Sequence, residues 1–219
     1  MAQYVIFGDT SFAERIQKYI TLENLDKVIC FTNEEFFITK DEINGIPVVP
    51  FETLSELYAK ESFEVLICIG YTQMNQLREK IYNLCKNKGY KIGTWISKSA
   101  IIYTEDIEEG NIIMPGVLLG PTCSLGKCNI LESRVCVSHD SVIGNFNFIS
   151  SAVTTGGNAN IGNHTFIGLN ATVRDGIKIE DYTLVGAAAN VLSSTSRERI
   201  YRGNPARLIE GKKSIDVKI

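Results

Sequence analysis

The sequence predicts a two-part fold: an α/β domain of parallel strands and helices, followed by a parallel β-helix built from six-residue repeats. Two observations carry this prediction. Before residue 97, short apolar segments alternate with helical segments, as in parallel strands joined by helical crossovers. After it, an aliphatic residue returns at every sixth position, which is typical of a hexapeptide β-helix. We therefore expect domains at 1–97 and 98–194, with a C-terminal tail at 195–219.

The N-terminal strands are short and mostly apolar. They are expected at Tyr4 to Phe7, Lys27 to Phe31, the segment IPVVP and Phe63 to Gly70, with KIGTWIS closing the set. Helices are expected in GDTSFAERIQKYI, in FETLSELYAK and in YTQMNQLREKIYNLCKNKGY, where Met74, Leu77, Ile81 and Leu84 recur at helical spacing. This alternation predicts a small Rossmann-like sheet.

The six-residue repeat continues over sixteen positions, of which fifteen are Ile, Leu or Val and the sixteenth is Thr155. The fifteen are Ile101, Ile107, Ile113, Leu119, Leu125, Leu131, Val137, Ile143, Ile149, Ile161, Ile167, Val173, Ile179, Val185 and Val191. The following position is often Gly, and the residue four places on is mostly small, as at Cys123, Ser141 and Ala159. We expect the aliphatic and small residues to face inward, with three repeats, or 18 residues, in each triangular coil. Such repeats usually wind left-handed, as solved hexapeptide folds do.

Composition and charge exclude several classes of function. The net charge of −3 and the pI near 5.5 argue against a general nucleic-acid binder, which would carry a basic surface. The start, MAQYVIFGDT, lacks the basic flank of a signal peptide, and no apolar stretch approaches membrane-spanning length. The six cysteines form no CxxC pair, so we expect reduced thiols in a cytoplasmic protein with no metal site.

His139 is one of two histidines in the chain and is followed at once by Asp140. The coil period places Gly157 directly above it, beside Thr155 and within the chain's Gly-Gly pair. We expect Gly157 to leave space for a ligand and to expose its N–H about 4.8 Å from the imidazole. A base and a nearby N–H donor are the minimal set for acyl transfer. The sequence therefore predicts that His139 is a catalytic base, the alternative being a surface histidine.

The neighbouring positions carry two further expectations. Adjacent strand residues point to opposite faces, so Asp140 can tune His139 only if the pair straddles a corner. His139 comes directly after the usual Gly position, which favours such a corner. His164, in IGNHTFIG, is expected to occupy an ordinary turn with nothing unusual in the neighbouring coils, and we assign it no function.

The segment VSHDSVIGNF, the tail YRGNPARLI and the N-terminal domain together resemble the sialic-acid O-acetyltransferase-like family. Within it, the likeness is greatest to the bacterial nucleotide-sugar N-acetyltransferases that use acetyl-CoA. The resemblance covers nearly the whole chain. It implies a homotrimer with active sites between adjacent β-helices and with CoA along the coil edges. It also implies that His139 is the general base that deprotonates the sugar amine, and that Asp140 raises its basicity.

The resemblance assigns binding residues as well. It implies that the Gly157 N–H meets the thioester carbonyl, and that further CoA contacts come from Leu169, Ala187 and the turn Gly203, Asn204, Pro205, Ala206 and Arg207. Arg207, Lys212 and Lys213 could meet the CoA phosphates or form a solvated basic tail. Substrate contacts are implied at Gly8, Thr10, Ser11, Phe12, Thr32, Asn33 and Gly70.

Two departures from the family pattern leave the acceptor sugar open. The family's first βα turn is usually glycine-rich with a histidine, whereas FGDTSFAER retains only Gly8 and adds the negative charge of Asp9. In addition, Phe148 stands where some relatives have a second histidine.

The leading expectation is transfer of acetyl from acetyl-CoA to the amino group of a nucleotide-linked (UDP-, dTDP- or GDP-) amino-deoxy-sugar, in surface-glycan synthesis. The amine is expected to attack directly, because no cysteine falls in the His139 column. Two alternatives remain. The same residues could acetylate a sugar hydroxyl, or the chain could be a non-catalytic sugar-binding module or scaffold.

Overall fold

The computed structural model describes residues 2–24 and 26–217, which form two compact units. The first unit is drawn from residues 1–70 and 78–95, and the second from residues 71–77 and 96–219. The short segment 71–77 therefore packs with the second unit, although the chain on either side of it belongs to the first.

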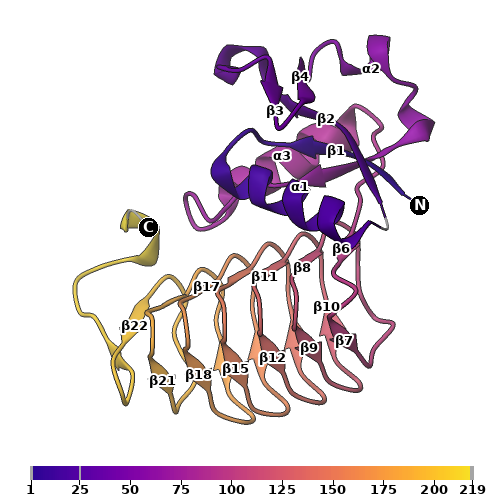
Figure 1. Cartoon of the computed structure of the whole chain (residues 1–219). Coiled ribbons are helices and arrows are strands. Elements are labelled where there is room, and N and C mark those ends of the chain that lie inside the picture. The colour runs from indigo at the N-terminus through magenta and orange to yellow at the C-terminus, as the bar shows by residue number, and fades with distance from the viewer. Residues whose placement is uncertain (1, 25, 218–219) are drawn as a thin grey trace. The chain divides into compact units, whose positions relative to one another are not determined.

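The first unit is built on a five-stranded sheet of order β3-β4-β2-β1-β5, parallel except for the β3–β4 pair. Its strands are β1 (Gln3–Phe7), β2 (Lys27–Asn33), β3 (Glu42–Ile43), β4 (Ile46–Pro50) and β5 (Glu64–Ile67). Its helices are α1 (Ser11–Glu23), α2 (Leu54–Leu57) and α3 (Gln76–Asn87), whose first two residues belong to segment 71–77, and its 3₁₀ turns are η1 (Glu35–Phe37) and η2 (Lys60–Ser62). The predicted alternation of strands and helices is thus confirmed (Figure 1). The prediction that KIGTWIS closes this sheet is wrong, because only Ile92 of this described segment bridges to it, at Val65, and the strand Trp95–Ile96 pairs within the second unit.

Two predicted helices are shorter than expected. The segment FETLSELYAK is helical only over α2, because Tyr58 adopts an extended conformation and packs edge-on against Phe63, with ring centroids 6.4 Å apart. Helix α3 begins at Gln76 rather than at Tyr71. Its expected first turn is replaced by three residues with φ of 52°, 50° and 65°, namely Gln73, Met74 and Asn75.

Contacts with the second unit's own strands explain the conformation of segment 71–77. The Tyr71 ring packs edge-on against Phe148 and Phe166, with centroids 4.8 and 5.0 Å away. The buried Asn75 side chain donates a hydrogen bond of 2.9 Å to the carbonyl of Thr165. These contacts outweigh the helical spacing of Met74 in the sequence, since backbone propensity is weaker than tertiary packing.

The second unit is a parallel β-helix whose short strands stack in three sheets (Figure 1). The six-stranded sheet contains β7 (Ile101–Ile102), β9 (Leu118–Leu119), β12 (Cys136–Val137), β15 (Thr154–Thr155), β18 (Thr172–Val173) and β21 (Asn190–Val191). The four-stranded sheet contains β10 (Ser124–Leu125), β13 (Val142–Ile143), β16 (Asn160–Ile161) and β19 (Lys178–Ile179). The eight-stranded sheet contains β6 (Trp95–Ile96), β8 (Ile112–Ile113), β11 (Ile130–Leu131), β14 (Phe148–Ile149), β17 (Phe166–Ile167), β20 (Leu184–Val185), β22 (Ile200–Arg202) and β23 (Arg207–Leu208).

The predicted 18-residue register is observed through most of the β-helix. Val137 pairs with Thr155, and Thr155 with Val173. The predicted inward residues from Ile113 onward are buried, including the small ones such as Ser141 and Ala159, whereas Ile107 is half-buried. The first repeat is an exception: Ile101 pairs with Leu118, a step of 17 residues, and its side chain is 47% exposed. The prediction that Ile101 points inward is therefore wrong, because this terminal coil is offset by one residue and one residue reverses the face.

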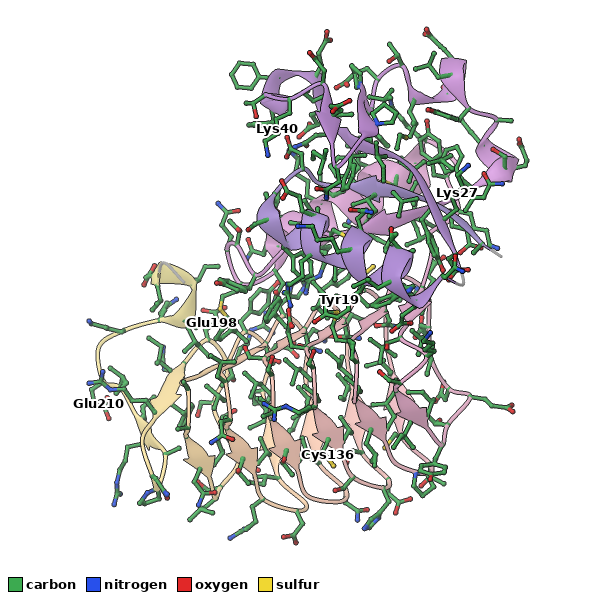
Figure 2. The ribbon with its side chains drawn as sticks, viewed as in Figure 1. Tyr19, Lys27, Lys40, Cys136, Glu198 and Glu210 are labelled. Atoms are coloured by element: carbon green, nitrogen blue, oxygen red, sulfur yellow. The ribbon has the colours of Figure 1, made fainter. Side chains whose placement is uncertain are left out.

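The C-terminal segment returns to the β-helix. Ile209, Ile215 and Val217 pack against Met74, Leu184 and Ile200, close to the 3₁₀ turn η3 (Ser214–Asp216). Glu198 and Glu210 lie on this yellow segment (Figure 2). Among the described residues, no helix is long and apolar enough to cross a membrane. All six cysteines are free thiols.

We predict that the inward aliphatic stack supplies most of the stability of the β-helix. Replacing Ile161→Ala, on β16, removes a buried side chain and leaves a cavity, and should lower the free energy of unfolding by about 2–5 kcal/mol. The matched control is Asn160→Ala, the exposed neighbour, for which we expect a change within about 0.5 kcal/mol. Denaturant titration measures both. Equal effects would contradict the assigned inward face.

Candidate active site

His139 and Asp140 lie at the corner that follows the six-stranded sheet. Asp140 has a φ of 57°, in the left-handed region, and the equivalent residues Thr122 and Asn158 have φ of 61° and 56°. The chain changes direction here, so two consecutive side chains can approach each other rather than point to opposite faces. His139 and Asp140 therefore straddle a corner, as expected from the sequence.

A short hydrogen bond joins the two side chains. The Nδ1 atom of His139 lies 2.7 Å from Oδ2 of Asp140, and the two side chains are 59% and 51% exposed. A carboxylate only accepts hydrogen bonds, so Nδ1–H is the donor, and in the neutral ring Nε2 keeps its lone pair. Exposed ion pairs contribute little to stability, so the main effect of this contact is to fix the ring's orientation and tautomer.

Thr122 supports Asp140 from the preceding coil. Its hydroxyl donates to Oδ1 of Asp140, and this bond, followed by that from His139, holds the pKa of the carboxyl below its ordinary value. The carboxylate is therefore ionised throughout the neutral range. Sequence reasoning missed Thr122, although the coil period was a sufficient signal: Thr122 precedes Asp140 by 18 residues.

Gly157 lies against the imidazole of His139, as the coil period predicted. A Cβ atom at position 157 would be 2.6 Å from both Cε1 and Nε2 of the ring. The space left by the missing side chain is thus occupied by the imidazole, which corrects the expectation that a ligand would fill it. Gly156 is needed for a different reason, because a Cβ there would be 2.5 Å from the main-chain nitrogen of Asp175.

The Gly157 N–H is available to a ligand. Within residues 2–24 and 26–217, this N–H donates to no protein acceptor, whereas the following one, of Asn158, donates to the His139 carbonyl at 2.9 Å. Because Nε2 lies so close to Gly157, a lone pair and an N–H donor sit side by side at this corner. A base and an N–H donor are two groups that transfer of an acyl group can use.

Three side chains, two of them from adjacent coils, hold the main chain around His139. The thiol of Cys123 lies 3.0 Å from the Ser138 carbonyl, and burial raises the pKa of this thiol, so it remains protonated and donates. The N–H of Ser138 donates to Oγ1 of Thr155 at 3.3 Å. The hydroxyl of Ser141 lies 3.4 Å from the His139 carbonyl.

The other predicted CoA contacts lie elsewhere on the β-helix. Leu169, which is 56% exposed, and Ala187 occupy the corner before the six-stranded sheet, whereas His139 follows that sheet. The Leu169 carbonyl accepts from the N–H of Ala188 at 2.8 Å, so the predicted column of 169 and 187 is present. One chain therefore does not bring this column and His139 to the same corner.

The turn Gly203, Asn204, Pro205, Ala206 and Arg207 lies at the end of the six-stranded sheet. Asn190, on β21, donates to the Gly203 carbonyl at 3.1 Å and accepts from the Ala206 N–H at 2.8 Å. A pocket of about 230 Å³ follows, lined by Arg199, Leu208, Ile209, Glu210, Gly211, Lys212 and Lys213. Arg207 does not line it, and Lys213 is paired with Glu198 at 3.2 Å.

In the first unit, the predicted substrate residues gather at the carboxyl ends of β1, β2 and β5. Gly8 has a φ of 121°, and a Cβ there would lie 2.9 Å from the Cys68 carbonyl oxygen, so only glycine fits. Thr10 precedes α1 and makes no side-chain cap, Ser11 begins the helix, and Phe12 lies beneath the guanidinium of Arg15.

Thr32, Asn33 and Gly70 differ in how much of each is accessible. Thr32 is fully buried and its hydroxyl donates to the Val49 carbonyl at 2.7 Å, which corrects its assignment to substrate contact, since that side chain is committed to the core. Asn33 donates to Oδ1 of Asp9 at 2.9 Å. The Gly70 carbonyl accepts from Arg78 at 2.7 Å.

His164 lies in a turn like those of the neighbouring coils, with a φ of 55°, but its surroundings are unusual. Its ring stacks between Phe146 and Tyr182, with centroids 5.3 and 4.7 Å away and interplanar angles of 16° and 3°. The guanidinium of Arg197 lies 5.3 Å from the Tyr182 ring. Both partners are 18 residues from His164, so the same period that located Gly157 would have located this stack. The expectation that nothing unusual neighbours His164 is wrong.

Solved structures share this fold over most of the chain, although no protein-family model matches it. The acetyltransferase domain of PglB from Neisseria gonorrhoeae FA1090 in complex with acetyl coenzyme A superposes with a TM-score of 0.83 at 20% identity, over 94% of this chain and 98% of that chain. A variant of perosamine N-acetyltransferase from Caulobacter crescentus, in complex with CoA and GDP-perosamine, gives 0.83 at 21% identity, over 95% and 97%. WeeI from Acinetobacter baumannii AYE gives 0.83 at 23% identity, over 95% and 100%. At these identities the likeness establishes a shared fold.

We predict that Gly157→Ala displaces the His139 ring without unfolding the chain, because the added Cβ would overlap Cε1 and Nε2. The chain has two histidines, so imidazole resonances in a proton–carbon correlation spectrum report on each. The control is Gly70→Ala, where a Cβ would meet nothing within 4 Å. Unchanged His139 resonances in Gly157→Ala would contradict the stacking.

We also predict that Thr122→Val raises the pKa of Asp140 toward its ordinary value. The hydroxyl donates to the charged carboxylate, so its loss favours the protonated form. Carboxyl-carbon NMR titration between about pH 2 and 6 measures the shift. Thr154→Val, at an exposed position on β15, is the matched control and should leave the titration of Asp140 unchanged. An unchanged titration of Asp140 in Thr122→Val would contradict the assigned role of the Thr122 hydroxyl.

Proposed function

We propose that this protein transfers the acetyl group of acetyl-CoA to the amino group of a nucleotide-linked amino-deoxy-sugar. The observation that carries the proposal is the corner at residues 138–157, where an oriented imidazole lies against a glycine peptide with a free N–H. The shared fold with PglB, whose structure contains acetyl coenzyme A, and with perosamine N-acetyltransferase, whose structure contains CoA and GDP-perosamine, supports this choice of substrates. It also supports the sequence's resemblance to that group of enzymes within the sialic-acid O-acetyltransferase-like family.

In the proposed reaction, the acceptor amine attacks the thioester carbonyl carbon. His139 takes the amine proton on Nε2 as the carbon–nitrogen bond forms, while its Nδ1–H remains bonded to Asp140. The Gly157 N–H donates to the carbonyl oxygen as negative charge develops there. The carbon–sulfur bond then breaks, and the proton held by His139 passes to the departing CoA sulfur. Every atom and proton is thereby accounted for, and no acylated cysteine is needed.

Assembly as a homotrimer is part of this proposal. The predicted CoA column at Leu169 and Ala187 and the base at His139 occupy different corners of one chain. A second copy placed beside the first would bring the column of one against the base of the other. The turn from Gly203 to Arg207 would then lie along the coenzyme, with Lys212 and Lys213 toward its phosphates.

The first unit would hold the nucleotide part of the acceptor. In sheets with parallel strands, ligands bind at the carboxyl ends of the strands, where Gly8, Ser11, Asn33 and Gly70 lie. The unit's Rossmann-like character, the left-handed sense of the β-helix, a cytoplasmic location and a role in surface-glycan synthesis belong to the same proposal. Thr32 would contribute through the core rather than through contact.

The decisive test uses purified full-length protein with acetyl-CoA and a panel of UDP-, dTDP- and GDP-linked amino-sugars. We predict release of CoA thiol and a product heavier by one acetyl group. His139→Asn should lower turnover by roughly 10²–10⁴-fold, because the proton acceptor is lost, while the molecular mass in solution is unchanged. The control changes the other histidine: His164→Phe retains the ring stack and should retain turnover.

Two outcomes would overturn the proposal in different directions. Acetylation of hydroxyl acceptors alone would identify a sugar O-acetyltransferase using the same residues. No thiol release with any acceptor, together with sugar binding that survives His139→Asn, would identify a non-catalytic binding module.

A further inference from the structure

The position of Thr155 in the core calls for an explanation. It occupies the inward column of the six-stranded sheet, where the other members are Ile102, Leu119, Val137, Val173 and Val191. Its side chain is fully buried. A hydroxyl is unfavourable in an apolar stack unless it is hydrogen-bonded, and valine has nearly the same shape without that requirement. The hydroxyl of Thr155 therefore needs a hydrogen-bond partner, which the apolar stack itself does not provide.

That partner is visible in the hydrogen bonds between coils. At four positions of this row, the N–H just after the inward residue donates to a main-chain carbonyl of the next coil. These bonds are Tyr103 to Leu119 at 2.9 Å, Gly120 to Val137 at 2.8 Å, Gly156 to Val173 at 2.8 Å and Arg174 to Val191 at 3.0 Å. At Ser138 the N–H donates instead to the Thr155 hydroxyl, at 3.3 Å. Ser138, whose N–H makes this different bond, immediately precedes His139.

A second buried hydroxyl makes the reverse connection. Ser141 belongs to the coil of His139, and its Oγ lies 3.3 Å from the Gly156 carbonyl of the next coil and 3.4 Å from the His139 carbonyl. It also accepts from the N–H of Ala159 at 3.2 Å. The Gly156 carbonyl and the Gly157 N–H are the two ends of one planar peptide, so a bond to the carbonyl fixes the direction of the N–H.

We infer that Thr155 and Ser141 are positioning residues that set the separation and angle between the His139 imidazole and the Gly157 N–H. Each hydroxyl comes from one coil and binds the main chain of the other, so the two bonds oppose both sliding and closing of the coils at this corner. Neither side chain touches the reacting atoms. This inference rests on the proposed function, since it assigns how that site is held.

The principal test is Thr155→Val. Without the hydroxyl, the Ser138 N–H can return to the main-chain carbonyl, and the apolar stack becomes continuous. We expect the melting temperature to be unchanged or higher and kcat to fall by about 10- to 100-fold, as for small displacements of reacting groups. The KM for acetyl-CoA should stay within about twofold, because binding contacts are untouched. Thr155→Ser, which keeps the hydroxyl, should retain most of the activity.

Thr165→Val is the matched control. Thr165 is also a fully buried threonine, but its hydroxyl bonds Oδ1 of Asn147, outside the His139 corner. We expect this change to lower the melting temperature with little effect on kcat. Ser141→Ala should lower kcat as Thr155→Val does. In the His139→Asn background, Thr155→Val should have no further effect, because the group that it positions is gone.

The outcomes separate this inference from the proposed function. A wild-type protein that releases no thiol with any acceptor overturns both. An active wild type whose Thr155→Val variant keeps its kcat overturns the inference alone. Equal losses in Thr155→Val and Thr155→Ser would overturn it too, since the hydroxyl would then not be the cause.

Discussion

The contacts of the β-helix site depend on the parallel stacking of coils in an 18-residue register. This register places each residue above its equivalent in the preceding coil. The constraint comes from the main-chain hydrogen bonds between coils, reinforced by the inward aliphatic column. Because side chains alternate between faces, a slip of one residue would turn this column outward. Once the register is set, the neighbours of any corner residue are determined, including those of His139.

This register turns a chain of small residues into a site. The corner brings Asp140 beside His139, the coil below supplies Thr122, and the coil above supplies Gly157. Each contact is modest, since exposed ion pairs and single hydrogen bonds stabilise little. Their combined effect is orientation: one imidazole nitrogen is committed to a carboxylate and the other is left beside a glycine peptide.

The same corner shows where optimal packing has been given up. A hydroxyl replaces an aliphatic group in the inward column, and a second glycine, Gly157, follows Gly156 where other coils have Pro121, His139 and Asp175. Both features bring the main chain of one coil within reach of side chains from the next. Departures from ideal local rules tend to gather at functional sites, and here they gather around His139.

The sequence by itself determined the β-helix, its register and the stacking of His139 under Gly157, because a strict repeat converts sequence separation directly into spatial neighbourhood. It also located β1, β2, β4 and β5 of the first unit, whose apolar runs are local signals, but not β3. Only the tertiary structure decided the left-handed turn at Gln73 to Asn75, the burial of the Thr32 side chain and the filling of the Gly157 space by the imidazole. The turn and the burial of Thr32 depend on contacts between residues whose separation in the sequence follows no period. The filling of the Gly157 space depends on the volume of the imidazole, which the repeat does not encode.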